Sequence, residues 1–544
     1  MKGRLMMKTV QAFMTVFAFV FAFVFVAASV LFAQGQTCST QFDWVRQSKS
    51  GFDPAFDSPF AIAVDPSSGD VLVTGGSSVP GGLYDMVTIR YNSAGDTVWV
   101  RRYNGPGDSW DDGRAIAIDP IGNVYVSGWS YSEEELFNYV TVKYTAMGEQ
   151  EWIAEYNATD DQVVDMTIDA SGNVYVTGRS GGVGTATDYA TVKYNTLGEQ
   201  QWVARYNGPG NTQDYAAGIA VDEQGNVYVT GSSGEGSENR SDFVTVKYNS
   251  SGVQQWVGRY TNYWDYATAI AVDASANVYV TGYSYAFGTY YDYVTVKYTT
   301  GGVERWVQRW NGPGTSDDLP YDIAIDASGN VIVTGDAFFV SGSGSDYGTV
   351  KYSPSGAEQW ARRYNGPGNA LDIASALAID ESGNIYVTGN SRDENLADDF
   401  GTIKYSASGD ELCVFRYGPD VGANETYYVA TAIALDQSGG AYVTGYSSEV
   451  GEKLYTTVKY GPVAVTGVDA PVPVRGLALA SPNPVIVGGL VTLRGMGTAP
   501  LEVFGPDGRR ILRLDHDTQF RAASPGVFLV RRGGQAQKLV VLGK

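Results

Sequence analysis

Four short phrases in the middle of the chain decide the fold: Ala217-Gly-Ile-Ala-Val-Asp222, Asn226-Val-Tyr-Val-Thr-Gly231, Phe243-Val-Thr-Val-Lys-Tyr248 and Gln255-Trp-Val-Gly-Arg-Tyr260. Each alternates or runs apolar over five or six residues and is bounded by Gly, Asn or Asp, which is typical of β-strands. The set recurs eight times, and the second phrase ends at glycines spaced 50 to 56 residues apart: Gly75, Gly128, Gly178, Gly231, Gly282, Gly335, Gly389 and Gly445. The period predicts four strands per repeat.

Such a four-stranded sheet cannot bury both faces alone, so neighbouring copies must stack, and radial stacking of sheets forms a β-propeller. The first strand of each copy is rich in small residues, which suits the crowded axis. The chain opens with a fourth-type strand around Trp44 and closes with a third-type strand ending at Tyr460. We therefore predict an all-β monomer with an eight-bladed β-propeller over residues 39–460, whose N-terminal strand completes the last blade and removes two free edges.

The connections between strands differ in length. Strands one and two, and strands three and four, are joined by tight turns such as Asp169-Ala-Ser-Gly-Asn173 and Asn195-Thr-Leu-Gly198. The other two connections are longer, vary in length and must lie at the opposite end. Variable loops on a rigid scaffold are where binding sites are usually built.

The segment from Gly218 to Gly231 resembles the signature of bacterial β-propeller repeat proteins of the SBBP type. The resemblance extends over residues 42–460. It implies a secreted or cell-surface location, but no shared reaction or ligand, and a fold alone does not supply a function.

The N-terminus predicts export. Lys2, Arg4 and Lys8 precede an apolar run from Val10 to Ala33, which indicates a signal peptide over residues 1–33. The alternative is an uncleaved membrane anchor, since the run is long enough to span a bilayer.

A Pro- and Val-rich linker is predicted over residues 461–480, followed by a small β-module over 481–544. Its Ser481-Pro-Asn-Pro484 and Pro525-Gly-Val-Phe-Leu-Val530 resemble the C-terminal sorting domain of type IX secretion substrates, an immunoglobulin-like β-sandwich. The resemblance implies recognition by the outer-membrane secretion machinery. A ligand-binding tail is the alternative.

Composition narrows the chemistry. The formal charge is −22, which disfavours binding to nucleic acid and to anionic membranes. His516 is the only histidine, so histidine-based triads and multi-histidine metal sites are excluded from the propeller, and two cysteines exclude thiolate zinc sites. We predict no catalytic site, no cofactor and no metal; an enzyme would have to use a pair of carboxylates.

Many carboxylates recur at fixed positions in six or seven of the eight repeats. One series stands five residues before an apolar residue of the first strand, and a second stands six residues before the Tyr that ends the third: Asp57, Asp111, Asp161, Asp214, Asp265, Asp318 and Asp372, then Asp85, Asp188, Asp242, Asp292, Asp346 and Asp399. A residue present in every blade serves every blade, by accepting turn amides or pairing with a neighbour. The same reasoning assigns the repeated Trp and third-strand Lys residues to packing between blades. Acidic loops such as that holding Asp108 lack the spacing of a calcium loop.

Cys413 stands where the other seven fourth-type strands have Trp, and Cys38 precedes the N-terminal strand. A disulfide fastening that strand is one possibility. We favour the simpler interpretation, a small buried residue and a free terminal thiol.

Function should reside where the repeat is broken. One blade carries eight aromatic side chains in its two long loops, next to carboxylates: Tyr263, Trp264, Tyr266, Tyr283, Tyr285, Phe287, Tyr290 and Tyr291. Such rings suit sugars or a protein partner. The alternative is that they pack over their own loops. A smaller group, Trp110, Trp129, Tyr131 and Phe137, marks the second blade.

We therefore predict a secreted or surface-displayed, non-catalytic binding or scaffolding module for a polysaccharide or an extracellular protein. The alternatives are a carboxylate-dependent glycosidase or lyase and a purely structural surface-layer component. Acids without counterparts in other repeats would favour the enzyme, and four such acids lie in long loops: Glu134, Glu135, Glu235 and Glu238.

Overall fold

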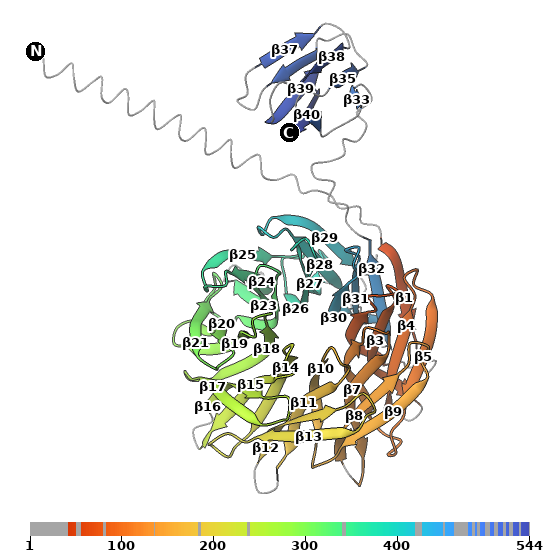
Figure 1. The fold of residues 1–544 in the computed structure, drawn as a ribbon, viewed down its shortest axis with the longest axis vertical. Helices are drawn as coiled ribbons and strands as arrows, with labels where there is room; N and C mark the ends of the chain where they lie inside the picture. Colours follow the sequence, from red (N-terminus) through yellow and green to blue (C-terminus); the bar gives the residue numbers. More distant parts are fainter. Residues whose placement is uncertain are drawn as a thin grey trace, which may run out of the picture. The chain divides into compact units, whose positions relative to one another are not determined.

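The computed structural model divides into two compact units, Met1–Val463 and Ala464–Lys544 (Figure 1). It describes residues 42–49, 56–79, 83–134, 136–182, 186–236, 240–339, 344–395, 397–418, 427–449 and 452–461, together with the backbone of short strands between 477 and 542.

Six separate four-stranded antiparallel sheets follow one another along the N-terminal unit. The first three contain β2 (Ser58–Val64), β3 (Val71–Val79), β4 (Leu83–Tyr91) and β5 (Thr97–Tyr103); β6 (Asp111–Ile118), β7 (Val124–Ser132), β8 (Leu136–Tyr144) and β9 (Gln150–Tyr156); and β10 (Gln162–Ile168), β11 (Val174–Gly181), β12 (Thr187–Tyr194) and β13 (Gln200–Tyr206). The next three contain β14 (Asp214–Val221), β15 (Val227–Glu235), β16 (Arg240–Tyr248) and β17 (Gln254–Tyr260); β18 (Asp265–Val272), β19 (Val278–Ala286), β20 (Tyr290–Tyr298) and β21 (Glu304–Trp310); and β22 (Leu319–Ile325), β23 (Val331–Phe339), β24 (Gly344–Tyr352) and β25 (Glu358–Tyr364).

Two further groups of strands share one eight-stranded sheet, linked by a parallel bridge between Asp398 and Tyr427. They are β26 (Asp372–Ile379), β27 (Ile385–Arg392), β28 (Asp398–Tyr405) and β29 (Glu411–Tyr417), then β30 (Tyr427–Leu435), β31 (Ala441–Glu449), β32 (Glu452–Tyr460) and β1 (Phe42–Ser48). β1 pairs antiparallel with β32, from Phe42 opposite Tyr460 to Ser48 opposite Tyr455. The predicted completion of the last sheet by the N-terminal strand is confirmed.

The sheets stand side by side around a common centre, with the first strand of each inside and the fourth outside (Figure 1). This arrangement is consistent with a β-propeller. Small residues in the first strand allow the close approach: Ala115, Ala216 and Ala374 are buried there. Each first strand also contains a register shift, as between Ala216 and Gly218, which bends it.

The hydrophobic core lies between sheets rather than within one. In one such cluster, Tyr125 and Tyr139 of one sheet pack with Val174 and Val176 of the next, all fully buried. Because each sheet is covered by its neighbours on both faces, its strands read as near-continuous apolar runs.

A Trp residue joins seven of the eight outer strands to a turn of the following sheet. The Trp202 indole donates to the Ser250 carbonyl over 3.1 Å, and Lys193 Nζ donates to the same oxygen over 3.3 Å. Gly252, with φ of +79°, covers the indole so closely that a Cβ there would lie 2.7 Å from the ring. Equivalent bonds join Trp44, Trp99, Trp152, Trp256, Trp306 and Trp360 to the carbonyls of Ser93, Ala146, Thr196, Thr300, Pro354 and Ala407. The predicted packing role of these residues between sheets is confirmed.

Cys413 stands in β29 where the other outer strands have Trp, and the pairing of β1 with β32 explains this exception. The third and fourth strands of the next group, β32 and β1, come from opposite ends of the chain, so no turn exists there to offer a Trp a carbonyl and a glycine. Cys413 is 1% exposed and is disulfide-bonded. Our preference for a free thiol was wrong. Cys38, the only other cysteine in the sequence, lies outside the described residues.

The C-terminal unit contains a three-stranded and a five-stranded sheet. Their strands are β33 (Leu477–Ala480), β34 (Val485–Ile486), β35 (Leu490–Gly495), β36 (Leu501–Phe504), β37 (Arg510–Leu514), β38 (Thr518–Arg521), β39 (Gly526–Arg532) and β40 (Gln535–Leu542). β33 thus lies within the range predicted as linker. The predicted signal peptide falls outside the described residues.

Across the described ranges, no helix has the length and apolar character to cross a membrane.

Candidate binding site

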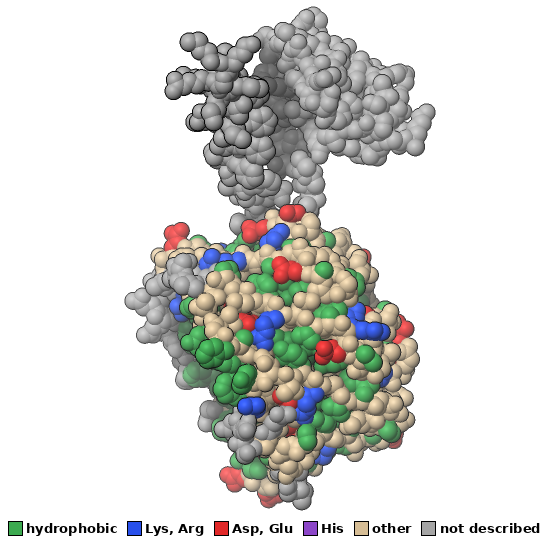
Figure 2. All heavy atoms as spheres, turned by 90° about the vertical axis from the view of Figure 1, so that its left-hand side faces the viewer, with side chains coloured by type: hydrophobic (Ala, Val, Ile, Leu, Met, Phe, Trp, Pro, Cys, Tyr) green, Lys and Arg blue, Asp and Glu red, His purple; other side chains and the backbone are tan. Residues whose placement is uncertain are grey.

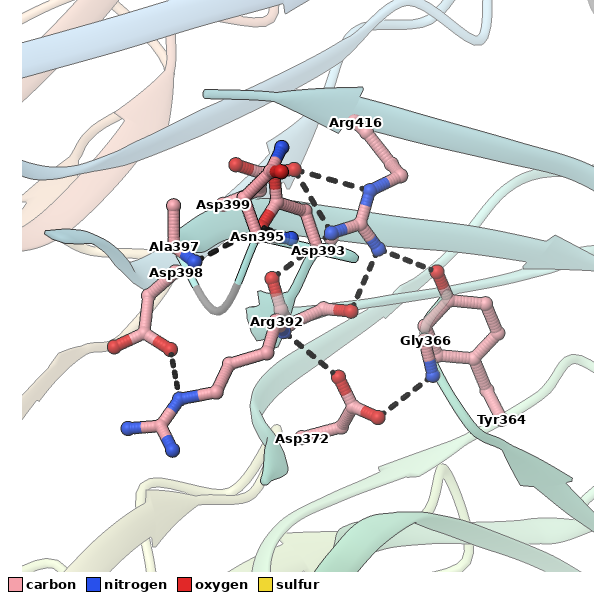
Figure 3. Close-up of polar contacts among 12 residues, drawn as sticks. Tyr364, Gly366, Asp372, Arg392, Asp393, Asn395, Ala397, Asp398, Asp399 and Arg416 are labelled. Atoms are coloured by element: carbon pink, nitrogen blue, oxygen red, sulfur yellow. Dashed lines mark hydrogen bonds and ion pairs between the residues drawn. The ribbon is translucent and has the colours of Figure 1, made fainter. Parts of the chain in front are cut away.

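The repeated aspartates form polar networks, one of which is shown where the sixth sheet meets the seventh (Figure 3). In β26, Asp372 accepts the amides of Gly366, over 2.6 Å, and of Arg392, over 3.0 Å. Asp399 pairs with Arg416 over 2.8 Å, and Arg416 also donates to the Tyr364 hydroxyl over 2.9 Å. These contacts tie the long connections to the strands.

Six other sheets repeat the first contact and five repeat the second; the second sheet has Asn138 at the second position, and the eighth sheet has Tyr428 at the first. The first series accepts backbone amides from Ser78, Gly105, Ala158, Gly208, Asn262 and Gly312. The second series pairs with Arg102, Arg205, Arg259, Arg309 and Arg363. Burial raises the pKa of Asp265 to about 6 and of Asp318 to about 7. The predicted structural role of the repeated acids is confirmed.

The eight predicted aromatic residues, which we call the aromatic surface, lie together at one end of the fifth sheet. The prediction that all eight are in loops was wrong, because only Tyr263, Trp264 and Phe287 are in loops and the other five lie in the ends of β18, β19 and β20. Of the two loops, the first enters β18 and the second connects β19 to β20. The Tyr285 amide donates to the Trp264 carbonyl over 3.0 Å, and Asn262 Nδ2 donates to the Tyr285 carbonyl over 2.8 Å. These bonds hold one loop against the other.

Seven of the eight rings form one connected set. Trp264 meets Tyr285 edge to face at 5.2 Å between ring centroids, and Tyr285 meets Tyr291 at 5.7 Å. Tyr291 also meets Tyr283 at 5.2 Å, and Tyr283 meets Tyr266 at 5.1 Å. Tyr263 and Tyr290 extend the set at its two ends, beside Trp264 and Tyr285. Edge-to-face pairs of this kind stabilise an ordered surface.

The rings divide by exposure. Phe287 is 98% exposed at the tip of the second loop, Tyr290 54% and Tyr263 51%, whereas the other five are half-buried. The half-buried rings therefore pack on the loops, and the three exposed rings are available for contact with another molecule. Tyr290 has a φ of +66°, which an L-residue adopts only where its surroundings hold it.

Polar groups of the sixth sheet border the aromatic surface. Asp317 accepts the Tyr291 amide over 3.4 Å. Burial raises the pKa of Asp336 in β23 to about 6, while a hydrogen bond from Tyr321 opposes the shift. Sequence reasoning missed Tyr321 and Asp336. Both depart from the repeat at their positions, which was the available signal.

Sequence reasoning also missed Asp165 in β10 and Asp322 in β22, which share one position of the inner strand where the other sheets have Ala or Gly. Asp165 accepts the amides of Met166 and Ile219, over 2.8 and 3.0 Å, so one carboxylate links two inner strands. Asp322 does the same for Ile323 and Leu377, over 2.8 and 2.7 Å. Burial raises the pKa of each to about 6.

The unmatched glutamates are placed only in part. Glu134 lies exposed in the turn after β7. Glu135, Glu238 and the side chain of Glu235 lie outside the described residues.

No group of three or more His, Cys, Asp or Glu side chains among the described residues is placed to hold a metal ion. On the outer wall seen in Figure 2, hydrophobic and charged side chains of both signs are mixed.

Several solved structures resemble the chain at low sequence identity. They are Sqt1 of Chaetomium thermophilum (12% identity, TM-score 0.49, covering 78% of this chain and 99% of that one), a Dyadobacter fermentans protein of unknown function (10%, 0.36, 76% and 98%) and a Xanthomonas campestris gluconolactonase (14%, 0.27, 53% and 90%). At these scores they carry no argument about function. No curated protein sequence matches the chain.

The SBBP beta-propeller repeat model matches residues 98–133, 201–236 and 359–397. Each match begins within the fourth strand of one sheet and ends just after the second strand of the following sheet. The matched repeat therefore crosses a sheet boundary. The resemblance seen in the sequence is confirmed for these three segments, which match the SBBP beta-propeller repeat.

Proposed function

We propose that the protein is an eight-bladed β-propeller that acts, secreted or at the cell surface, as a non-catalytic binding module for a polysaccharide or an extracellular protein. The observation that carries the proposal is the aromatic surface. Its exposed rings, Tyr263, Phe287 and Tyr290, stand at the loop end of the fifth sheet. The second sheet carries a smaller counterpart of this set: Trp110, Trp129, Tyr131 and Phe137.

The chemistry of the surface favours carbohydrate. Ring faces stack on the C–H faces of sugars, and tyrosine hydroxyls and nearby carboxylates exchange hydrogen bonds with sugar hydroxyls. Asp317 lies beside Tyr291 and could accept such bonds. A protein partner would use the same rings as anchors.

A broad glycan array tests the proposal, with wild type beside a variant carrying Tyr263→Ala, Phe287→Ala and Tyr290→Ala. These rings are the exposed ones, so their loss should leave the melting temperature nearly unchanged. Tyr215→Ala is the matched control, because Tyr215 is an exposed tyrosine at the position in β14 that Tyr266 occupies in β18.

Glycan binding by wild type and by the control, but not by the triple variant, is the expected result. Equal binding by all three proteins would show that sugars bind elsewhere. If no glycan binds, a protein partner or a structural surface-layer role takes precedence.

A second candidate function, a carboxylate-dependent glycosidase or lyase, is favoured by Asp165 and Asp322, since both acids replace the Ala or Gly of the other sheets and have raised pKa values. Against it, both oxygens of each carboxylate already accept amides. The enzyme hypothesis would be supported if wild type cleaves a polysaccharide and the double variant Asp165→Asn with Asp322→Asn folds but does not cleave it.

For export, we propose a signal peptide over residues 1–33 and a sorting role for residues 481–544 through the outer-membrane secretion machinery. Mass and N-terminal sequence of the protein recovered outside the producing cell test both. A mature chain that starts near residue 34 and lacks the tail is expected; retention inside cells of a variant without 481–544 completes the test.

A further inference from the structure

A gap in the repeat lies where the first sheet meets the second. The residue directly after the second-phrase glycine has a side chain in every sheet but the first: Gly76, Trp129, Arg179, Ser232, Tyr283, Asp336, Asn390 and Tyr446. Asp112, at the start of β6, fills the space. Its Oδ1 lies 2.9 Å from where a Cβ on residue 76 would be.

Asp112 is a buried carboxyl with one oxygen unused. Its Oδ2 accepts a bond from Arg114 Nη2 over 2.9 Å. Its Oδ1 has no hydrogen-bond partner among the described residues, although Asp112 is only 9% exposed. Burial raises the pKa of this carboxyl to about 7, against the lowering effect of Arg114. An unmet buried acceptor is costly, and a ligand hydroxyl or amide would relieve that cost.

Arg114 offers the complementary donors. Its guanidinium lies 3.9 Å from the Phe60 ring centroid and 5.3 Å from that of Trp129, and its side chain is 31% exposed. Its Nε has no partner within the described part of the chain. A guanidinium carries five N–H groups and binds carboxylates through two of them at once.

An aromatic wall adjoins this pair. Trp129 stands opposite Asp112 in the strand register and meets Phe137 edge to face at 5.0 Å. Phe137 meets Tyr131 at 4.9 Å, and Tyr131 leads to Trp110, which is 42% exposed. An acceptor, a charged donor and aromatic faces thus lie together.

We propose that Asp112, Arg114 and Trp129 form a second binding site, which takes the carboxylate-bearing residue of an acidic saccharide. The ligand carboxylate bonds to Arg114, a ring hydroxyl donates to Asp112 Oδ1, and the sugar face lies against the indole. This site is in the first two sheets, apart in sequence and sheet from the aromatic surface, so each stands or fails independently.

Isothermal titration of the full chain at low salt tests the site. The probes are trisaccharides of galacturonic, glucuronic and mannuronic acid, each with its neutral counterpart. We expect at least one acidic probe to bind about tenfold or more tightly than its neutral match, since a hydrogen bond between charged groups has about that effect.

Arg114→Gln should weaken that binding about tenfold. Gly76→Ala, which displaces Asp112 Oδ1, should weaken it as well. Ser375→Ala, at the position in β26 that Arg114 occupies in β6, is the matched control and should bind as wild type.

Thermal melts verify that each variant folds. If the Arg114→Gln variant does not fold, binding by the Gly76→Ala variant tests the proposal. The proposal is overturned if no acidic probe binds, if acidic and neutral probes bind alike, or if the folded variants bind as wild type.

Discussion

At the scale of single residues, the repeat separates structural side chains from candidates for function. The Trp and Gly of each sheet boundary illustrate the first kind, since the φ of +79° at Gly252 and the 2.7 Å approach to Trp202 leave no room for a Cβ. Asp165 illustrates what pattern reading misses. It replaces a small residue of the inner strand. Its two oxygens accept amides from its own strand and from the neighbouring one, and the second of these contacts could be seen only in the structure.

Gly252→Ala should lower the free energy of unfolding by about 1–3 kcal/mol, because it adds both backbone strain and a clash with the indole. Chemical denaturation measures the change. Gly236→Ala is the control: Gly236 also has positive φ, but a Cβ there would meet nothing within 4 Å. Equal losses of unfolding free energy in the two variants would show that the contact between Gly252 and Trp202 does not contribute to stability.

The raised pKa values of Asp165 and Asp322 predict how stability depends on pH. A carboxyl with a folded pKa of about 6 and an ordinary value of 3.8 holds its proton more tightly when folded. Its contribution to the free energy of unfolding is complete below pH 3.8 and is lost as the pH rises through 6.

The melting temperature should therefore fall between pH 4 and pH 7, and less steeply when both residues are changed to Asn. Because Asn offers one acceptor oxygen for two amides, this variant should also melt lower at pH 4. An unchanged pH slope would contradict the assignment.

At the scale of elements, the strands were predictable because each phrase is bounded by turn residues and recurs eight times. The two loops of the aromatic surface were assigned to one end of one sheet from their order alone. Their ring contacts were not predictable, since they depend on the bond between Tyr285 and Trp264. The disulfide at Cys413 was considered but not preferred for a related reason: its position matters only because β32 and β1 lack a connecting turn.

Cys413→Trp tests whether the missing turn between β32 and β1 is the reason why β29 has no Trp. In β29 a Trp would find neither turn carbonyl nor glycine, so under reducing conditions it should melt below Cys413→Ala. Oxidised wild type should melt above its own reduced form, because the cross-link restrains the unfolded chain. A Trp variant as stable as the Ala variant would show that this position can accept the ring.

At the scale of the whole molecule, a closed ring of near-identical sheets provides a rigid frame, and only departures from the repeat can distinguish one sector from another. The repeat alone predicted the all-β architecture and the closure by β1. The contribution of the sixth sheet to the aromatic surface was not predictable, because contacts between sheets depend on loop geometry. Without β1, the edge of β32 is unpaired, and the core residue Trp44 is lost.

A chain lacking residues 34–49 should therefore melt well below wild type. A shortened chain that still contains Phe42–Ser48 serves as the control. Equal melting of the truncated and complete chains would rule out closure by β1 as a source of stability.

The most direct measurement is hydrogen–deuterium exchange of the full chain with and without a saturating polysaccharide or protein ligand found by array or pull-down. Binding through the aromatic surface predicts slower exchange in residues 261–266 and 283–291, with the turn segment 249–253 at the opposite end unchanged. Protection confined to the turn end, or to the outer strands, would contradict a binding role for the aromatic surface.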